Sequence, residues 1–222
     1  MKTKLFRITA LMIACLLTVS FACAEGGYDF QIAEDGALFV NGYKALYPID
    51  AEAQAIPYQA ENVPIRFQIP AGWTEVETEQ DERFSLMAQF VPVKEPDQGM
   101  MILVMAGDFM NFVDESNKLL LKMMGIKPEE MDNSLFDAVD FTGMFGMSEE
   151  NIVKKTYGEQ QFYQFNLNQD QSYGSMTIRL NMTSSICLRN GLFYQFMTIG
   201  NAETNELYNG YEQLLETVEY TD

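Results

Sequence analysis

The sequence predicts an α+β domain: a mainly antiparallel β-sheet with helices packed on it. Strand patterns come first, two helical stretches interrupt them, more strands follow and a helix ends the pattern. Because strands and helices do not alternate, a parallel sheet is not expected. The clearest strand, residues 176–189, has apolar side chains at even positions and polar ones at odd positions. Asn190-Gly191 follows it and favours a tight hairpin turn into a strand over residues 192–199.

A two-residue turn also fixes the register of this hairpin. It opposes Arg189 to Leu192 and Cys187 to Tyr194. Cys187 then lies on the more polar face of the strand. It is either a small packed residue, which we favour, or a thiol that pairs between chains.

The other elements follow from periodicity and turn chemistry. Alternation or an apolar run predicts further strands over residues 65–69, 84–91, 100–106, 152–157 and 161–167. Apolar residues at helical spacing predict helices over residues 109–124, 129–139 and 207–218, the first ending at Gly125. Phe109, Phe112, Val113, Leu120, Met123 and Met124 form the apolar face of the first helix. Asp-Gly and Asn-Gly turns predict a short β meander over residues 28–47, followed by a connector.

The first residues have the pattern of a secretory signal peptide. Three cations precede an apolar run over residues 8–21, and Ala22-Cys23-Ala24 is a small-x-small cleavage site. Cleavage between Ala24 and Glu25 is expected, and a run of this length is too short to span a bilayer. Lipidation at Cys23 is the alternative. The protein is therefore expected to be secreted or extracytoplasmic, with a lipid anchor as the alternative and no transmembrane span.

Composition excludes several kinds of chemistry. The chain has 222 residues, 14 Lys+Arg, 32 Asp+Glu and no His, which gives a net charge of −18. Without His there is no Ser-His-Asp triad and no imidazole zinc site. The signal segment holds three cations and no acid, so the rest of the chain carries a net charge of −21. That charge argues against nucleic acid as a partner.

One segment resembles a known family. Residues 65–69, followed by Pro70-Ala71-Gly72-Trp73, are similar to the opening of PsbP-like domains, named for an extrinsic photosystem II subunit. The order of the later elements is similar too, so the resemblance covers about residues 62–220. It implies an αβα sandwich with a non-enzymatic binding or accessory role, and carries over no functional residue. The expected division is a signal peptide (1–24), a β meander and connector (25–61) and a PsbP-like domain (62–222).

Candidate metal sites are weak. Oxygen-bearing side chains recur at Asn166, Asn168, Asp170 and Ser172. An EF-type calcium loop needs Gly and Glu where this segment has Gln171 and Thr177, so a polar turn between two strands is favoured. Methionine thioethers can bind copper(I), but most of the methionines occupy predicted core positions. We therefore expect no metal and no cofactor.

Two kinds of surface site remain. Met144, Phe145 and Met147 lie in a predicted loop and form a candidate apolar contact patch.

Adjacent acids such as Glu129/Glu130, Glu149/Glu150 and Asp81/Glu82 point apart and do not form catalytic dyads. Phe162, Tyr163, Phe165, Tyr194 and Phe196 form either a binding face or, as we favour, the core of a sheet covered on both faces.

The resulting functional hypothesis is an exported, non-enzymatic binding or accessory protein of unknown specificity, whose partner is a protein or a small molecule. A secreted hydrolase that uses carboxylates is the alternative. A third, less favoured hypothesis is a protein that binds calcium or copper(I). No catalytic residue is predicted.

Overall fold

The computed structural model describes residues 30–32, 38–40, 43–44, 54–78, 81–92, 101–113, 115–138, 152–173, 176–200 and 205–221. The N-terminal part forms three short antiparallel strands, β1 (Phe30–Ile32), β2 (Leu38–Val40) and β3 (Tyr43–Lys44). They confirm the predicted β meander. The predicted signal peptide, with Cys23, Ala24 and Glu25, lies outside the described residues, and so does the candidate patch Met144, Phe145 and Met147.

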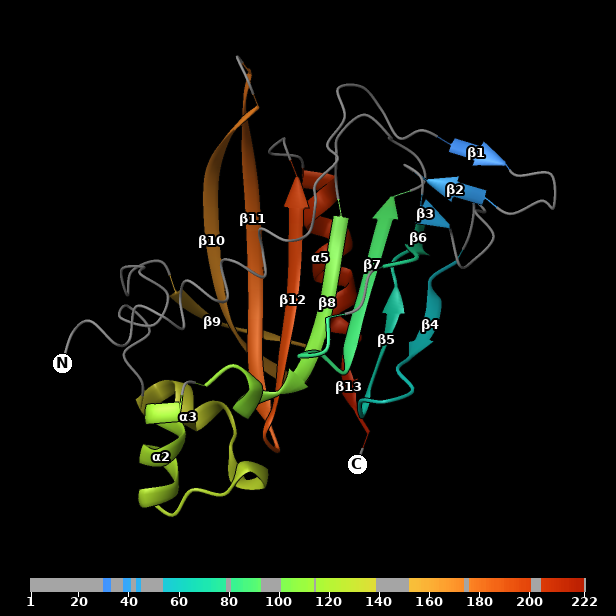
Figure 1. The fold of residues 1–222 in the computed structure, drawn as a ribbon. Helices are drawn as coiled ribbons and strands as arrows, with labels where there is room; N and C mark the ends of the chain where they lie inside the picture. The colour runs from blue at the N-terminus through green and yellow to red at the C-terminus, as the bar shows by residue number, and fades with distance from the viewer. Residues whose placement is uncertain are drawn as a thin grey trace.

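A seven-stranded antiparallel sheet is the centre of the fold, which confirms the α+β class (Figure 1). Its strand order is β6-β7-β8-β12-β11-β10-β9. The strands are β6 (Trp73–Val76), β7 (Leu86–Pro92), β8 (Met101–Asp108), β9 (Ile152–Tyr157), β10 (Gln160–Tyr173), β11 (Met176–Arg189) and β12 (Leu192–Gly200). Strand β6 was not predicted.

The β11–β12 hairpin has the predicted turn and register. Asn190 and Gly191 have φ angles of 49° and 77°, the left-handed conformation that a two-residue hairpin turn requires. Arg189 pairs with Leu192, and Cys187 pairs with Tyr194. Polar residues do occupy most odd positions of β11, but Ser185 and Cys187 among them are buried, so both faces of the strand are covered at these residues.

The first face of the sheet packs against a second, smaller sheet and the C-terminal helix. The small sheet has the order β13-β5-β4, made of β4 (Ile56–Gln59), β5 (Ile65–Ile69) and β13 (Glu219–Tyr220). Arg66 Nε donates to Glu219 Oε2 at 2.7 Å and ties β5 to β13. Helix α5 (Asn205–Glu216) lies beside it, where the Tyr211 hydroxyl donates to the Phe196 carbonyl at 2.9 Å. Neither β4 nor β13 was predicted.

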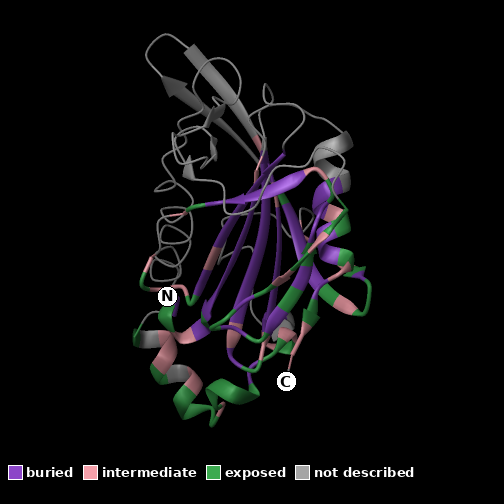
Figure 2. Ribbon diagram, turned by 90° about the vertical axis from the view of Figure 1, so that its right-hand side faces the viewer, coloured by how far each residue is buried: buried purple, intermediate pink, exposed green. Residues whose placement is uncertain are grey.

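The second face is covered in part by a group of short helical segments, here called the helical lobe. It comprises η2 (Phe109–Asn111), α2 (Glu115–Met123), η3 (Pro128–Glu130) and α3 (Asn133–Ala138). Phe109, Phe112, Val113, Met131 and Phe136 pack against Tyr163, Phe165, Ile186, Leu188 and Phe193 of the sheet. Figure 2 shows the sheet as buried and the lobe as largely exposed on its outer side. The prediction of a sheet covered on both faces is therefore confirmed.

Strand β10 is longer than the sequence indicated. It continues to Tyr173, and its residues pair with β11 up to Tyr173↔Met176. The segment from Asn166 to Ser172, considered above as a calcium loop, is therefore part of a strand. The favoured prediction of a polar turn at this segment is wrong, and so is the alternative of a calcium loop.

Candidate functional site

The helical lobe is attached to the sheet at the turn of the β11–β12 hairpin. The Phe109 N–H donates to the Gly191 carbonyl at 2.9 Å, and the Gly191 N–H donates to the Met131 carbonyl at 2.9 Å. Asp108 caps η2, because its side chain accepts from the Met110 N–H at 2.8 Å. The start and the middle of the lobe are therefore held at the same turn.

Asn133 makes a second connection between lobe and sheet. Its Oδ1 accepts from the Leu188 N–H at 2.8 Å, and its Nδ2 donates to the Gln161 carbonyl at 2.9 Å. The Tyr163 hydroxyl donates to the Asn133 carbonyl at 3.3 Å. One side chain therefore bridges α3 to two strands. The lobe is a fixed element on which α2 is presented.

Helix α2 carries the candidate contact surface. Leu119, Met123 and Met124 are 59%, 76% and 62% exposed, and only Val153 joins them as an exposed large hydrophobic residue within the described part of the chain. Leu119 and Met123 are one helical turn apart on the same face, and Met124 follows in the turn that ends the helix. The buried side of α2 includes Leu121, which packs against the lobe core. The prediction that Met123 and Met124 lie on an apolar core face is wrong.

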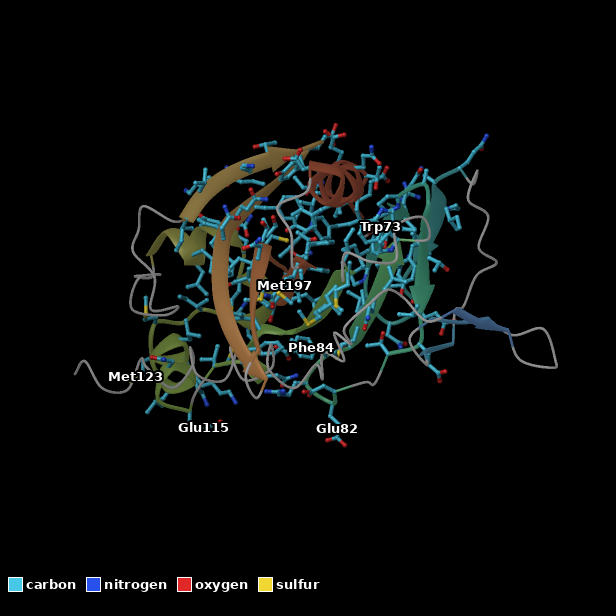
Figure 3. All side chains as sticks on the ribbon, turned by 90° about the horizontal axis from the view of Figure 1, so that it is seen from above. Trp73, Glu82, Phe84, Glu115, Met123 and Met197 are labelled. Atoms are coloured by element: carbon cyan, nitrogen blue, oxygen red, sulfur yellow. The ribbon has the colours of Figure 1, made fainter. Side chains whose placement is uncertain are left out.

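Lysines flank these exposed apolar side chains. Residues 118–127 contain Lys118, Lys122 and Lys127 and no acid, in a chain with a net charge of −18. Lys118 pairs with Glu115 at 2.8 Å and Lys127 pairs with Glu130 at 3.2 Å. Both are exposed pairs between residues three apart, which contribute little to stability. We call Leu119, Met123 and Met124 with the three lysines the α2 surface. Figure 3 shows Met123 at the periphery of the molecule, whereas Met197 lies over the middle of the sheet.

Cys187 is buried and hydrogen-bonded, so it is not available for pairing between chains. Its Sγ and the Tyr220 hydroxyl share a hydrogen bond at 2.7 Å, and Tyr220 packs edge-on against Tyr194 with ring centroids 4.8 Å apart. Burial raises the pKa of Cys187 to about 12, despite Arg189 nearby. Burial also raises the pKa values of Tyr194 and Tyr220. A thiol that stays protonated is a poor nucleophile, so this cluster is suited to packing.

A second polar cluster joins β9, β10, β11 and α5. The Tyr157 hydroxyl donates to Glu212 Oε1 at 3.0 Å, and Gln164 Nε2 donates to the Ser185 hydroxyl at 3.0 Å and to the Tyr157 hydroxyl at 3.2 Å. Lys155 Nζ lies 3.8 Å from Glu212. Each of these groups has a partner within the fold. The cluster therefore attaches α5 to the sheet.

Among the described carboxylates, Asp81 has a pKa shifted away from what acid catalysis needs. Asp81 accepts hydrogen bonds from the Arg83 side chain, which lowers the pKa of Asp81 to about 2. A carboxyl group that acts as a general acid near neutral pH needs a raised pKa instead. Glu82, Glu129 and Glu130 are exposed. Within the described residues, no group of three or more Cys, Asp or Glu side chains is placed to hold a metal ion.

Comparisons with known proteins do not identify the chain. No family model matches the sequence, and no curated protein matches it. A solved structure from Bacteroides thetaiotaomicron is similar over 77% of this chain, with 9% identity and a TM-score of 0.45. This chain spans half the length of that protein. LpqN of Mycobacterium tuberculosis, a protein involved in cell envelope biogenesis, is similar over 76% of this chain and 91% of its own, with 14% identity and a TM-score of 0.38.

At such TM-scores, neither structure bears on what this chain does. The PsbP-like resemblance therefore stays an expectation. Within the described ranges, no helix has the length and apolar character needed to cross a membrane.

The sequence did contain a signal for the α2 surface. Leu119, Leu120 and Leu121 are consecutive, and three successive positions of a helix turn through about 200°, so they cannot all face one core. Lys118 and Lys122 recur at the spacing of one helical turn beside Leu119 and Met123. The pattern therefore indicated an apolar stripe with a lysine border.

Proposed function

We propose that this chain is an exported accessory protein that acts by binding, and that the α2 surface is where it contacts its partner. The observation that carries the proposal is the exposure of Leu119, Met123 and Met124 together on one small element. Scattered exposed apolar residues are ordinary, but a group of large ones on a single surface is typical of an interaction site. The signal-peptide pattern supports a contact outside the cytoplasm.

A role without catalysis fits the titratable groups of the described residues. The Cys187 thiol is buried and has a raised pKa, and Asp81 has a lowered one. Enzymes instead hold acids and nucleophiles near neutral pKa values in an accessible cleft. The polar side chains around Tyr157 and Gln164 hydrogen-bond to each other, and this is typical of a cluster that stabilises a fold.

The test is site-specific crosslinking in the host's own envelope. A photo-crosslinking residue replaces Met123 in one variant and the exposed Gln68 of β5 in the control. We expect a reproducible product from position 123 and none from position 68. A Leu119→Ser substitution should reduce the yield from position 123, because it removes a neighbouring apolar contact. Equal products from both positions, or no product from either, would contradict the proposal.

A further inference from the structure

We infer that Met123 and Met124 form a reversible oxidation site, and that the sulfoxides which a peroxide forms there release the partner of the α2 surface. The inference rests on the proposed function, since it names a control on the same surface. Three features carry it: the exposure of the two thioethers, their share of the apolar part of the α2 surface, and their distance along the chain from the contacts that hold the lobe.

Met123 and Met124 differ from the other methionines in their access to solvent. Met123 is 76% exposed and Met124 is 62% exposed. Among the methionines whose burial the structure describes, no other is exposed. Met131 and Met197, by contrast, are 2% and 1% exposed, so an oxidant reaches them only when the fold opens. A peroxide in solution therefore meets the sulfur atoms of Met123 and Met124 directly.

The oxidation of each thioether by hydrogen peroxide needs no further reactant. A lone pair of the sulfur attacks one peroxide oxygen, so that an S–O bond forms and the O–O bond breaks. The sulfur gives up two electrons, and the leaving hydroxide takes the proton of the transferred oxygen and becomes water. Methionine sulfoxide reductases reverse the change with a pair of thiols, which become a disulfide while the oxygen leaves as water. The site can therefore be switched in both directions.

Oxidation removes most of the apolar area of the α2 surface. Met123 and Met124 are two of its three exposed apolar side chains, and Leu119 is the third. A thioether is flexible and apolar, whereas a sulfoxide is polar and chiral. A sulfoxide pressed against an apolar partner buries an oxygen without a hydrogen-bond donor, which costs free energy. Leu119 cannot be oxidised, so we expect binding to be weakened rather than abolished.

The contacts that hold the lobe on the sheet lie at other residues. Leu121 packs against the lobe core, and Asn133 bridges α3 to β10 and β11. The Gly191 N–H donates to the Met131 carbonyl at 2.9 Å. Oxidation of two exposed side chains of the lobe therefore changes the binding surface and leaves the lobe attached. This separates a change in binding from a loss of the fold.

Crosslinking from position 119 tests the inference with the full processed chain. A photo-crosslinking residue replaces Leu119, so both methionines stay in place. The purified chain is treated with hydrogen peroxide, freed of peroxide with catalase and then added to its host's envelope, so the partner meets no oxidant. Peptide mass spectrometry measures the sulfoxide at each methionine. We expect about tenfold less product after oxidation, and recovery after treatment with reductases for both sulfoxide epimers.

Matched variants assign the effect to this site. Met123→Leu/Met124→Leu keeps two apolar side chains of similar volume that cannot be oxidised, so peroxide should leave its yield unchanged. Met144→Leu/Met147→Leu removes two methionines from the segment between α3 and β9, and it should stay as sensitive as the unaltered chain. Urea unfolding should give the same midpoint before and after the short oxidation, because the fold does not depend on the two exposed side chains.

Failure of the inference and failure of the proposed function give different results. No product from position 119 in the unoxidised chain would overturn both. If the unoxidised chain gives a product, an equal yield after full conversion of Met123 and Met124 to sulfoxides would overturn the oxidation site alone. An equal loss of product in Met123→Leu/Met124→Leu would also overturn it, since another oxidised group would then be responsible.

Discussion

Gly191, in the turn between β11 and β12, lies against the backbone of Pro128 in the helical lobe. A Cβ atom at position 191 would be 2.4 Å from the Pro128 carbonyl oxygen. The N–H of the same glycine donates to the Met131 carbonyl at 2.9 Å. The hairpin turn and the lobe that carries the α2 surface therefore approach each other at a point where only glycine fits.

Substitution of this glycine should destabilise the protein strongly. Gly191→Ala combines a positive φ of 77° with an overlap against backbone, and we expect a loss of about 3 kcal/mol in the free energy of unfolding. Gly125→Ala is the matched control, because Gly125 has a φ of 74° and no atom within 4 Å of its Cβ position. It should cost only about 1–2 kcal/mol. Urea unfolding measures both, and equal losses would mean that the hairpin and the lobe are not in close contact.

Thr198 offers a stabilising substitution. Its hydroxyl is buried on β12 and has no hydrogen-bond partner in the described structure. Thr198→Val removes the unpaired hydroxyl and should raise the free energy of unfolding by about 1 kcal/mol. Ser184→Ala is the contrasting variant, because Ser184 accepts from Gln195 Nε2 at 3.0 Å. It should destabilise by about 1–3 kcal/mol, since a buried amide loses its acceptor. A destabilised Thr198→Val variant would show that the hydroxyl has a partner.

The cluster around Cys187 predicts a loss of stability at alkaline pH. The thiol has an ordinary pKa of 9.0 when unfolded and about 12 in the folded chain, so the folded state keeps a proton that the unfolded state releases. Stability is therefore full below pH 9 and falls as the pH rises from about 9 to about 12. Tyr220 and Tyr194 act in the same direction, because their pKa values are also raised.

Urea unfolding at about pH 8 and about pH 10.5 measures this fall. The thiol contributes up to about 1.4 kcal/mol per pH unit, so Cys187→Ala should lose stability less steeply with pH than the unaltered chain. The comparison uses slopes, because the substitution also leaves a small cavity. An unchanged slope in Cys187→Ala would mean that the thiol does not titrate differently in the two states.

Much of the fold followed from local patterns. The bounds of β11 and the turn at Asn190-Gly191 were predicted correctly, because strand alternation and turn chemistry are properties of neighbouring residues. The small sheet was not predicted. Strand β13 has only two residues, and its partner β5 lies about 150 positions earlier in the chain. Such a pairing depends on tertiary contacts and leaves no periodic pattern.

The α2 surface was missed for a related reason. A single helix over residues 109–124 would place Phe112, Val113 and Met123 on one side. The chain instead forms the short 3₁₀ helix η2 and begins α2 at Glu115, so the phase of the pattern changes between them. Phe112 stays buried while Met123 turns outward. In β11, likewise, the alternation of side chains predicts which face is polar. It does not predict whether another element of the fold covers that face.

Methionine oxidation provides the most direct test of contact through the α2 surface. Met123 and Met124 are exposed in the free protein, whereas Met131 and Met197 are buried and serve as internal controls. A short peroxide treatment followed by peptide mass spectrometry compares the free protein with the protein in its host's envelope. We predict that oxidation of Met123 and Met124 falls several-fold in the envelope, while Met131 and Met197 stay unoxidised in both. Equal oxidation of Met123 in the two states would contradict the account, because the surface would then be as open to solvent in the envelope as in the free protein.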